Sequence, residues 1–69
     1  MIYSIGDIFI DVRGEQRRTI LITDAYIDGL EPINYELYIT PDEKDDVWSH
    51  YMLKLYIDRG YLIHYPVVK

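Results

Sequence analysis

VWSHYMLKLYI, which spans Val47–Ile57, carries the clearest helical pattern in this chain. Its apolar residues recur at spacings of three and four, in the two series Val47, Tyr51, Leu55 and Trp48, Met52, Tyr56. On an α-helix these spacings produce one broad apolar face. The segment therefore predicts a helix from Val47 to Ile57 that lies across a sheet.

The residues on either side of this segment resemble the two ends of a helix. Thr40-Pro41-Asp42-Glu43 has the form of a capping box, with threonine as the cap, proline at the first helical position and glutamate three residues after the cap. Asp45 or Asp46 could equally cap a later start. Arg59-Gly60 supplies a basic last turn and the glycine that commonly follows a helix C-terminus.

A strand is predicted from Ile5 to Val12, where aliphatic residues alternate with Asp7 and Asp11. This period of two is typical of a half-buried strand whose polar side carries the two aspartates. Phe9 interrupts that polar side, so we expect both faces of the strand to be partly covered.

Two further strands follow along the chain. Arg13-Gly14-Glu15-Gln16 predicts a turn, and a strand rich in β-branched residues runs from Arg17 or Arg18 to Tyr26, so that the first two strands form an antiparallel hairpin. Asp28-Gly29 and Glu31-Pro32 indicate a second turn and a short loop. The alternation in Asn34–Ile39 then predicts a third strand.

The segment Tyr61-Leu62-Ile63-His64-Tyr65 predicts a last strand, which Pro66 ends. The expected fold class is α+β, with a small antiparallel sheet or barrel of about four strands and one helix in the C-terminal half, in the order β-β-β-α-β. With 69 residues the chain is too short for a second core, so residues 1–69 are expected to form a single domain.

The opening Tyr3-Ser4-Ile5-Gly6-Asp7-Ile8-Phe9, together with the β-meander and the late helix that leads through Gly60 into a final strand, resembles small SH3-like barrel proteins of bacteria and phages. The Gly-Asp turn at the start is similar to one that is common in such barrels. The predicted helix is longer than the single turn that these barrels usually carry, so an open sheet with one packed helix stays an alternative. The resemblance implies a binding module that presents loops and sheet edges to partners.

The composition describes a small acidic chain without cysteine. Seven Lys and Arg against twelve Asp and Glu give a net charge of −5. Because nucleic-acid affinity depends largely on basic side chains, we expect a basic protein surface as partner and no direct binding to DNA or RNA. The absence of cysteine favours a reducing, cytoplasmic setting. No apolar run approaches the roughly 18 residues that span a membrane, and we predict neither membrane insertion nor a cofactor.

The densest charged feature is the acidic cluster, formed by Asp42, Glu43, Asp45 and Asp46. Clustered carboxylates can bind a divalent cation, but their spacing matches no calcium loop and we predict no metal site. They can also mimic phosphate groups and occupy a basic groove made for nucleic acid. A third interpretation is an acidic helix N-terminus. We assign these four residues to the predicted partner-binding surface.

The two histidines, His50 and His64, are expected on the helix and on the last strand. They could approach each other as a metal pair or as an acid/base couple. However, no serine lies in a nucleophile elbow, and no glycine-rich phosphate loop is present. We therefore predict no enzymatic activity and no catalytic residue, with His50 at the edge of the helix face and His64 on the solvent side of its strand.

The chain has eight tyrosines besides Trp48 and Phe9, more aromatic side chains than so small a core can hide. Tyrosines on such a domain either cap the rim of the core or form an interface with another molecule. Tyr38 and Tyr61 occupy strand positions that are expected to face outward, and we add them to the predicted partner-binding surface.

The basic residues Arg13, Arg17 and Arg18 surround the first hairpin turn. Asp11 and Glu15 lie beside them in the sequence. We therefore expect a locally salt-bridged or solvated hairpin there, and no contact with nucleic acid.

Three hypotheses on function follow. The first is a small interaction protein, of the kind that phages and mobile elements encode, which binds a host or phage protein through its tyrosines and acidic residues. The second is a nucleic-acid mimic that inhibits a DNA- or RNA-processing enzyme. The third is a homo-oligomeric structural protein, in which a copy of the chain closes the sheet edge or the aromatic face.

Overall fold

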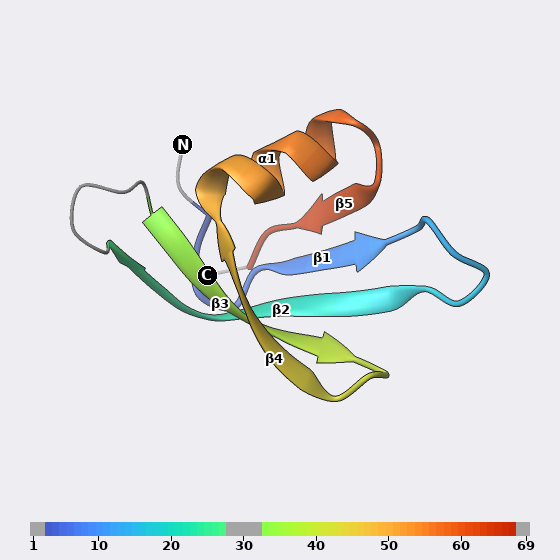
Figure 1. The fold of residues 1–69 in the computed structure, drawn as a ribbon, viewed down its shortest axis with the longest axis horizontal. Helices are drawn as coiled ribbons and strands as arrows, with labels where there is room; N and C mark the ends of the chain where they lie inside the picture. The colour runs from blue at the N-terminus through green and yellow to red at the C-terminus, as the bar shows by residue number, and fades with distance from the viewer. Residues whose placement is uncertain (1–2, 28–32, 68–69) are drawn as a thin grey trace.

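The computed structural model describes residues 3–27 and 33–67, which form five β-strands and one α-helix (Figure 1). In chain order the elements are β1 (Ile8–Asp11), β2 (Arg18–Ile27), β3 (Ile33–Thr40), β4 (Lys44–Ser49), α1 (His50–Asp58) and β5 (Leu62–Tyr65). Neighbouring strands pair antiparallel in the order β4-β3-β2-β1-β5. The predicted α+β class is confirmed. The turn predicted at Asp28-Gly29 and the loop at Glu31-Pro32 lie outside the described residues.

The strand β4 takes the place of the predicted start of the helix, so the predicted order β-β-β-α-β is wrong. Residues 41–43 form a turn, and β4 then runs back along β3 with Trp48 opposite Tyr35. Thr40-Pro41-Asp42-Glu43 is thus part of a hairpin connection and not a capping box. Pairing with β3 provides backbone hydrogen bonds and packs Trp48 against the core, which outweighs a local preference for a helix cap.

The helix α1 begins after β4, with Ser49 as its N-cap. Ser49 Oγ accepts a hydrogen bond from the backbone N–H of Met52 at 3.2 Å, which is the usual role of serine at this position. After Asp58 the C-cap is Arg59, and Gly60 follows with a φ of +79°, a left-handed conformation that glycine adopts without steric cost. The predicted C-terminal end of the helix is therefore confirmed. Within the described ranges, no helix is long and apolar enough to cross a membrane.

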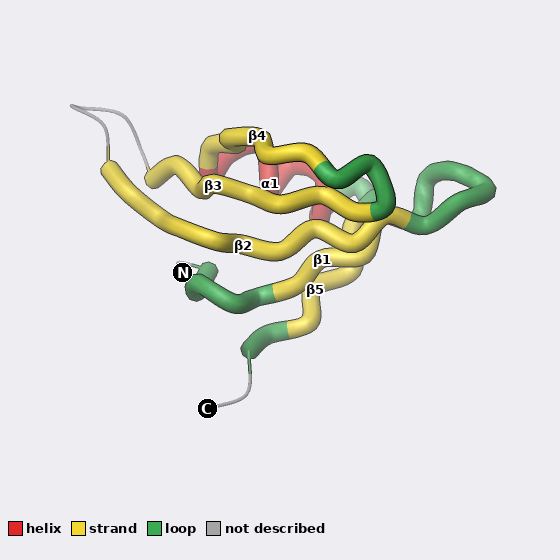
Figure 2. The backbone as a smooth tube through the Cα atoms, turned by 90° about the horizontal axis from the view of Figure 1, so that it is seen from below, coloured by secondary structure: helices red, strands yellow, loops and turns green. Residues whose placement is uncertain are grey.

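The sheet is open, because β4 and β5 are its two edge strands and do not pair with each other. The helix α1 connects them along the chain and packs against both, as well as against β3. Figure 2 shows the strands in this order across the sheet, with β4 and β5 at opposite margins. The sheet is not a closed barrel, and of the two predicted architectures the open sheet with one packed helix is the one observed.

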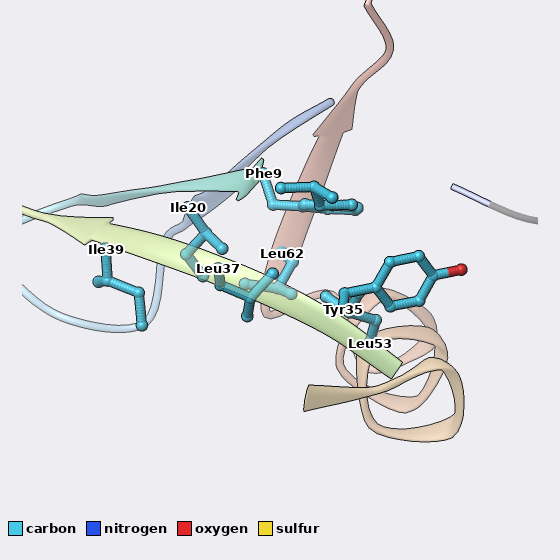
Figure 3. Close-up of a cluster of buried hydrophobic side chains, with 8 residues drawn as sticks. Phe9, Ile20, Tyr35, Leu37, Ile39, Leu53 and Leu62 are labelled. Atoms are coloured by element: carbon cyan, nitrogen blue, oxygen red, sulfur yellow. The ribbon is translucent and has the colours of Figure 1, made fainter. Parts of the chain in front are cut away.

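The core lies between the sheet and α1 (Figure 3). Its almost completely buried apolar side chains, as far as the chain is described, are Phe9, Ile20, Ile22, Tyr35, Leu37, Ile39, Leu53 and Leu62. Burial of an aliphatic or aromatic side chain of this size stabilises a fold by roughly 1.5–3 kcal/mol. Leu53 is the fully buried residue of α1, so the broad apolar face predicted for the helix narrows to one central leucine with partly buried Tyr56 and Ile57 beside it.

The orientation of β1 is opposite to the one that its alternation of isoleucine and aspartate suggests. Phe9 is fully buried, and Asp7 and Asp11 on the same face are only 3% and 6% exposed. Ile8 and Ile10 lie on the other face and are partly buried there. This orientation is stable because both carboxylates find hydrogen-bond partners, while the isoleucines keep apolar neighbours on adjacent strands.

Leu53→Ala should destabilise the protein by about 2–5 kcal/mol, because it removes the fully buried side chain of α1 from the core. Lys54→Ala, at the next and exposed position, should change the free energy of unfolding by less than about 0.5 kcal/mol. Urea denaturation followed by circular dichroism measures both. Equal losses of stability would contradict this packing of α1 on the sheet.

Candidate functional site

The face of the sheet opposite α1 carries a row of side chains that crosses all five strands. The strand register places these residues opposite one another, from β5 to β4. We call this set the outer row, and it consists of Tyr65, Ile8, Leu21, Tyr38 and Asp45. Because they alternate with core-facing residues on their strands, these side chains point away from the core.

A second row lies beside the outer row and consists of Ile63, Ile10, Thr19 and Thr40. The two rows together form the surface that we call the outer face. Ile63 is 44% exposed and Tyr65 is 53% exposed, whereas the residues on the central strands are shielded in part by their neighbours. The outer face is therefore most accessible and most apolar at β5.

Carboxylates border the outer face at its opposite side. Asp45 on β4 and Glu36 on β3 are both exposed and point away from the core. The strand β5, in contrast, has no acidic or basic residue besides His64. The outer face thus carries exposed carboxylates toward β4, where Val47 is also exposed, and no carboxylate on β5.

The acidic cluster lies in the β3–β4 turn and on β4, so its predicted place at the start of a helix is wrong. Asp42 forms an ion pair with Arg18 at 3.4 Å, and Asp46 accepts hydrogen bonds from two donors on its own strand. Glu43 and Asp45 are exposed and have no polar contact with the described residues. Of the four predicted residues, Asp45 alone belongs to the outer face.

The two tyrosines predicted at the partner-binding surface take different positions. Tyr38 lies in the outer row, partly buried. Tyr61 precedes β5 and packs against Tyr56 of α1, with 6.0 Å between ring centroids. The structure therefore separates this pair, and it brings Tyr65, which was not among the predicted binding residues, into the outer row.

Arg13 is held by one carboxylate and two aromatic rings. Its Nε and Nη2 donate hydrogen bonds to Asp11 Oδ1 at 3.0 Å and Oδ2 at 2.8 Å, and its guanidinium carbon lies 5.0 Å from the ring centroids of both Tyr56 and Tyr61. These hydrogen bonds lower the pKa of Asp11 and raise the pKa of Arg13. Of the two expected forms, salt-bridged or solvated, the hairpin is salt-bridged at Arg13, which also contacts Tyr56 of α1.

An open cavity of about 570 Å³ lies between the first hairpin turn and the β3–β4 turn. Its lining residues are polar or charged except for one glycine, and they are Asp11, Arg13, Gly14, Glu15, Gln16, Arg18 and Asp42. Both lining arginines already pair with a carboxylate of the same lining. Because this pairing leaves neither arginine to recruit an anion, we assign the cavity no binding role.

A second polar cluster surrounds Tyr3 on the core side of the sheet. His64 Nε2–H donates a hydrogen bond to Asp7 Oδ2 at 2.8 Å, and the His64 ring stacks on Phe9 with 4.7 Å between centroids. The Tyr3 ring contacts both His64 and His50, with centroid distances of 5.1 and 5.2 Å. The predicted position of His64 on the solvent side of its strand is therefore wrong, because it shares the core face with Phe9.

Asp7 joins the two ends of the described chain. Besides His64, it accepts hydrogen bonds from the backbone N–H groups of Ser4 at 3.1 Å and Val67 at 2.8 Å. Burial opposes the charge on Asp7, but these hydrogen bonds outweigh it and lower the pKa. Gly6 beside it has a φ of +96°, and a Cβ there would lie 3.3 Å from a methyl carbon of Val67, so only glycine suits this turn.

The two histidines have different hydrogen-bond partners. His50 Nδ1 lies 3.0 Å from the Tyr35 hydroxyl, which accepts a hydrogen bond from the backbone N–H of Tyr3 at 3.2 Å. Within the described ranges, no group of three His, Asp or Glu side chains could hold a metal ion. An Asp–His pair can transfer a proton in principle, but the ring of His64 is packed against Phe9 and Tyr3. We therefore assign the Asp7–His64 pair a structural role.

The sequence contained only a weak signal for these contacts. Asp7 and His64 are 57 residues apart, so no local spacing connects them. The position of Asp7 directly after a glycine, on the same side of the strand as Phe9, was the available signal.

The chain matches no family model, no curated protein and no solved structure.

The free energy of unfolding should fall as the pH drops below about 3.8, the ordinary pKa of aspartate, because Asp7 and Asp11 both have lowered pKa values in the fold. A carboxyl group of this kind stabilises the folded state while it is ionised, and this stabilisation disappears when the group becomes protonated. Thermal unfolding measured from neutral pH into acid tests the direction.

Asp7→Asn should reduce this acid dependence and should cost at least about 1.5 kcal/mol at neutral pH, because it weakens hydrogen bonds to a buried charge. Asp45→Asn is the control, since Asp45 is exposed and has no polar contact with the described residues. An identical pH dependence in both variants would show that Asp7 does not carry the effect.

Arg13→Lys should destabilise the protein by about 1 kcal/mol, since lysine keeps the charge but loses the two-pronged hydrogen bonding and the planar stacking. Solvent screens part of the pair, because the Arg13 side chain is 40% exposed. Arg17→Lys, at a neighbouring exposed position, is the matched control and should have no measurable effect on the melting temperature. Equal melting temperatures for the two variants would exclude the proposed role of Arg13.

Proposed function

We propose that this chain is a protein-binding module that recognises its partner with the outer face of its sheet. The observation that carries this proposal is the outer row, in which apolar and aromatic side chains on four adjacent strands lead to Asp45 on the fifth. Of the described elements, α1 covers the other face. A contiguous apolar surface bordered by polar residues is typical of an interaction site.

The chemistry of the outer face indicates the kind of partner. Its β5 side would contact apolar side chains, while Asp45 and Glu36 would face lysine or arginine on the partner. Tyr38 and Tyr65 combine an apolar ring with a polar hydroxyl, which suits a partly hydrated interface. The net charge of −5 would further attract a basic protein.

We infer a cytoplasmic module that acts by binding a host or phage protein, without catalysis and without a cofactor. The resemblance to small SH3-like barrels supports a binding role only as a fold-level analogy. The cysteine-free composition supports a reducing environment.

Nucleic-acid mimicry is the second candidate function. It is favoured by the β3–β4 hairpin, where Asp42, Glu43 and Asp45 are exposed close together in the chain. It ranks second because Asp42 pairs with Arg18 and Asp46 is bound by its own strand, which leaves few carboxylates to imitate a row of phosphates.

The test compares immobilised variants as baits in a lysate of the organism that encodes the chain. A specific partner should be retained by the unmodified protein and by Tyr51→Lys, and should be lost with Tyr38→Lys. Both substitutions replace a tyrosine by lysine, but Tyr51 lies on α1 with 67% exposure, whereas Tyr38 lies in the outer row. Circular dichroism checks that all baits are folded.

Two further measurements separate the candidate functions. Neutralising Asp45 and Glu36 together should weaken capture and reduce its dependence on salt, because their charges face the partner. Duplex DNA should release the partner only if the module imitates nucleic acid. If the same proteins bind to all three baits, or if no protein is captured, the outer face is not the binding surface.

A further inference from the structure

Among the described strands, none pairs with the outer edge of β5, where two residues direct their backbone groups away from the sheet. Val12 N–H donates a hydrogen bond to the carbonyl oxygen of Tyr61 at 3.0 Å, and in an antiparallel pair every second residue bonds to the same neighbour. From the β1–β5 register, Ile63 and Tyr65 therefore face β1, while Leu62 and His64 direct their N–H and C=O groups to the open edge. Pro66, which has no N–H, ends this edge.

The opposite edge strand, β4, is protected by its own side chains. The N–H of Val47 is bound by Asp46 Oδ1 at 2.8 Å, and Asp46 Oδ2 also accepts a hydrogen bond from Trp48 Nε1 at 3.1 Å. Lys44 and Asp45 add charges of the kind that keep edge strands from pairing with other molecules. A strand that approached the β4 edge would therefore encounter charged side chains and a backbone N–H that is already hydrogen-bonded.

Exposed apolar side chains gather near β5. Ile63 is 44% exposed and Tyr65 is 53% exposed, and both belong to β5, a strand that contains no Asp, Glu, Lys or Arg. Ile5 and Val67 lie in the two terminal segments that Asp7 connects. They are 56% and 36% exposed. An apolar edge strand with open backbone groups is a surface that pairs readily with another strand.

We propose that β5 pairs antiparallel with β5 of a second copy of this chain, about a two-fold axis that passes beside Ile63. In this register Leu62 of each copy lies opposite His64 of the other, so all open N–H and C=O groups of both strands find a partner. Ile63 then faces its own counterpart in a non-hydrogen-bonded position, where two Cα atoms are about 4.5 Å apart.

The distribution of charge favours a second copy as the occupant of this edge. The exposed carboxylates Asp45 and Glu36 lie toward the β4 margin, so two copies joined at β5 keep them at opposite ends of one continuous sheet (Figure 2). The edge strand contains no Asp, Glu, Lys or Arg to recruit a charged partner, and its isoleucine is complementary to its own copy. The dimer does not depend on partner binding, but it would join two outer faces into one surface.

The chain contains no cysteine, so a single introduced cysteine reports which strands meet. Ile63→Cys should form a disulfide-linked dimer under mild oxidation, because the facing Cα atoms lie within the range that a disulfide spans. Val47→Cys is the matched control, since Val47 lies on β4 with a similar exposure of 48%. Electrophoresis without reducing agent should show a dimer band for the first variant and monomer for the second.

Light scattering on the unmodified protein provides the second readout. The protein should shift from monomer to dimer as its concentration rises from micromolar to millimolar, and Ile63→Lys should prevent the shift while Val47→Lys should not. In the dimer, the amide protons of Leu62 and His64 should exchange more slowly than in the monomer. Tyr38→Lys should leave the dimer intact, so a failure of partner binding is distinguished from a failure of dimerisation.

A protein that stays monomeric at millimolar concentration would overturn the proposal. Equal cross-linking through positions 63 and 47 would also overturn it, because it would indicate random collision. A dimer that survives Ile63→Lys would place the interface elsewhere on the molecule and would equally exclude pairing at β5.

Discussion

The structure depends on two inward-facing aspartates, Asp7 directly before β1 and Asp11 at its end. Asp7 binds His64 and the two ends of the described chain, and Asp11 binds Arg13. Buried carboxylates without partners would cost several kcal/mol, and the strand would then be more stable with its isoleucines inward. Because both carboxylates are bound, Phe9 between them can be buried, and this orients the whole strand.

The orientation of β1 creates the surface that we propose as functional. Ile8 and Ile10 point away from the core, where they meet apolar residues of β2 and β5 and lead to Tyr38 on β3. A shift of one residue along β1 would exchange the two faces and would remove this continuous apolar row. The internal hydrogen bonds of Asp7 and Asp11 therefore determine indirectly what a partner protein meets.

The two edges of the sheet have opposite character, and this difference follows from their side chains. Asp46 binds the backbone N–H of Val47, and the charged residues Lys44 and Asp45 precede it on β4, so this edge is protected against pairing with other strands. On β5 the exposed side chains are Ile63 and Tyr65, and the residue between them is His64. The strand contains no Asp, Glu, Lys or Arg. Part of the acidic cluster thus protects an edge, a role that its composition did not indicate.

Local patterns in the chain were sufficient to predict the first hairpin, the strand that contains Tyr35 and Leu37, and the end of the helix at Arg59-Gly60. These features depend on alternation, on turn residues and on glycine, all of which act between near neighbours in sequence. Lys44–Ser49 could not be assigned in this way, since the residues before it suit a capping box as well as a turn, and pairing with β3 makes it a strand. The inward aspartates and the position of His64 also required the folded chain, because the groups that satisfy buried charges come from segments far apart in the sequence.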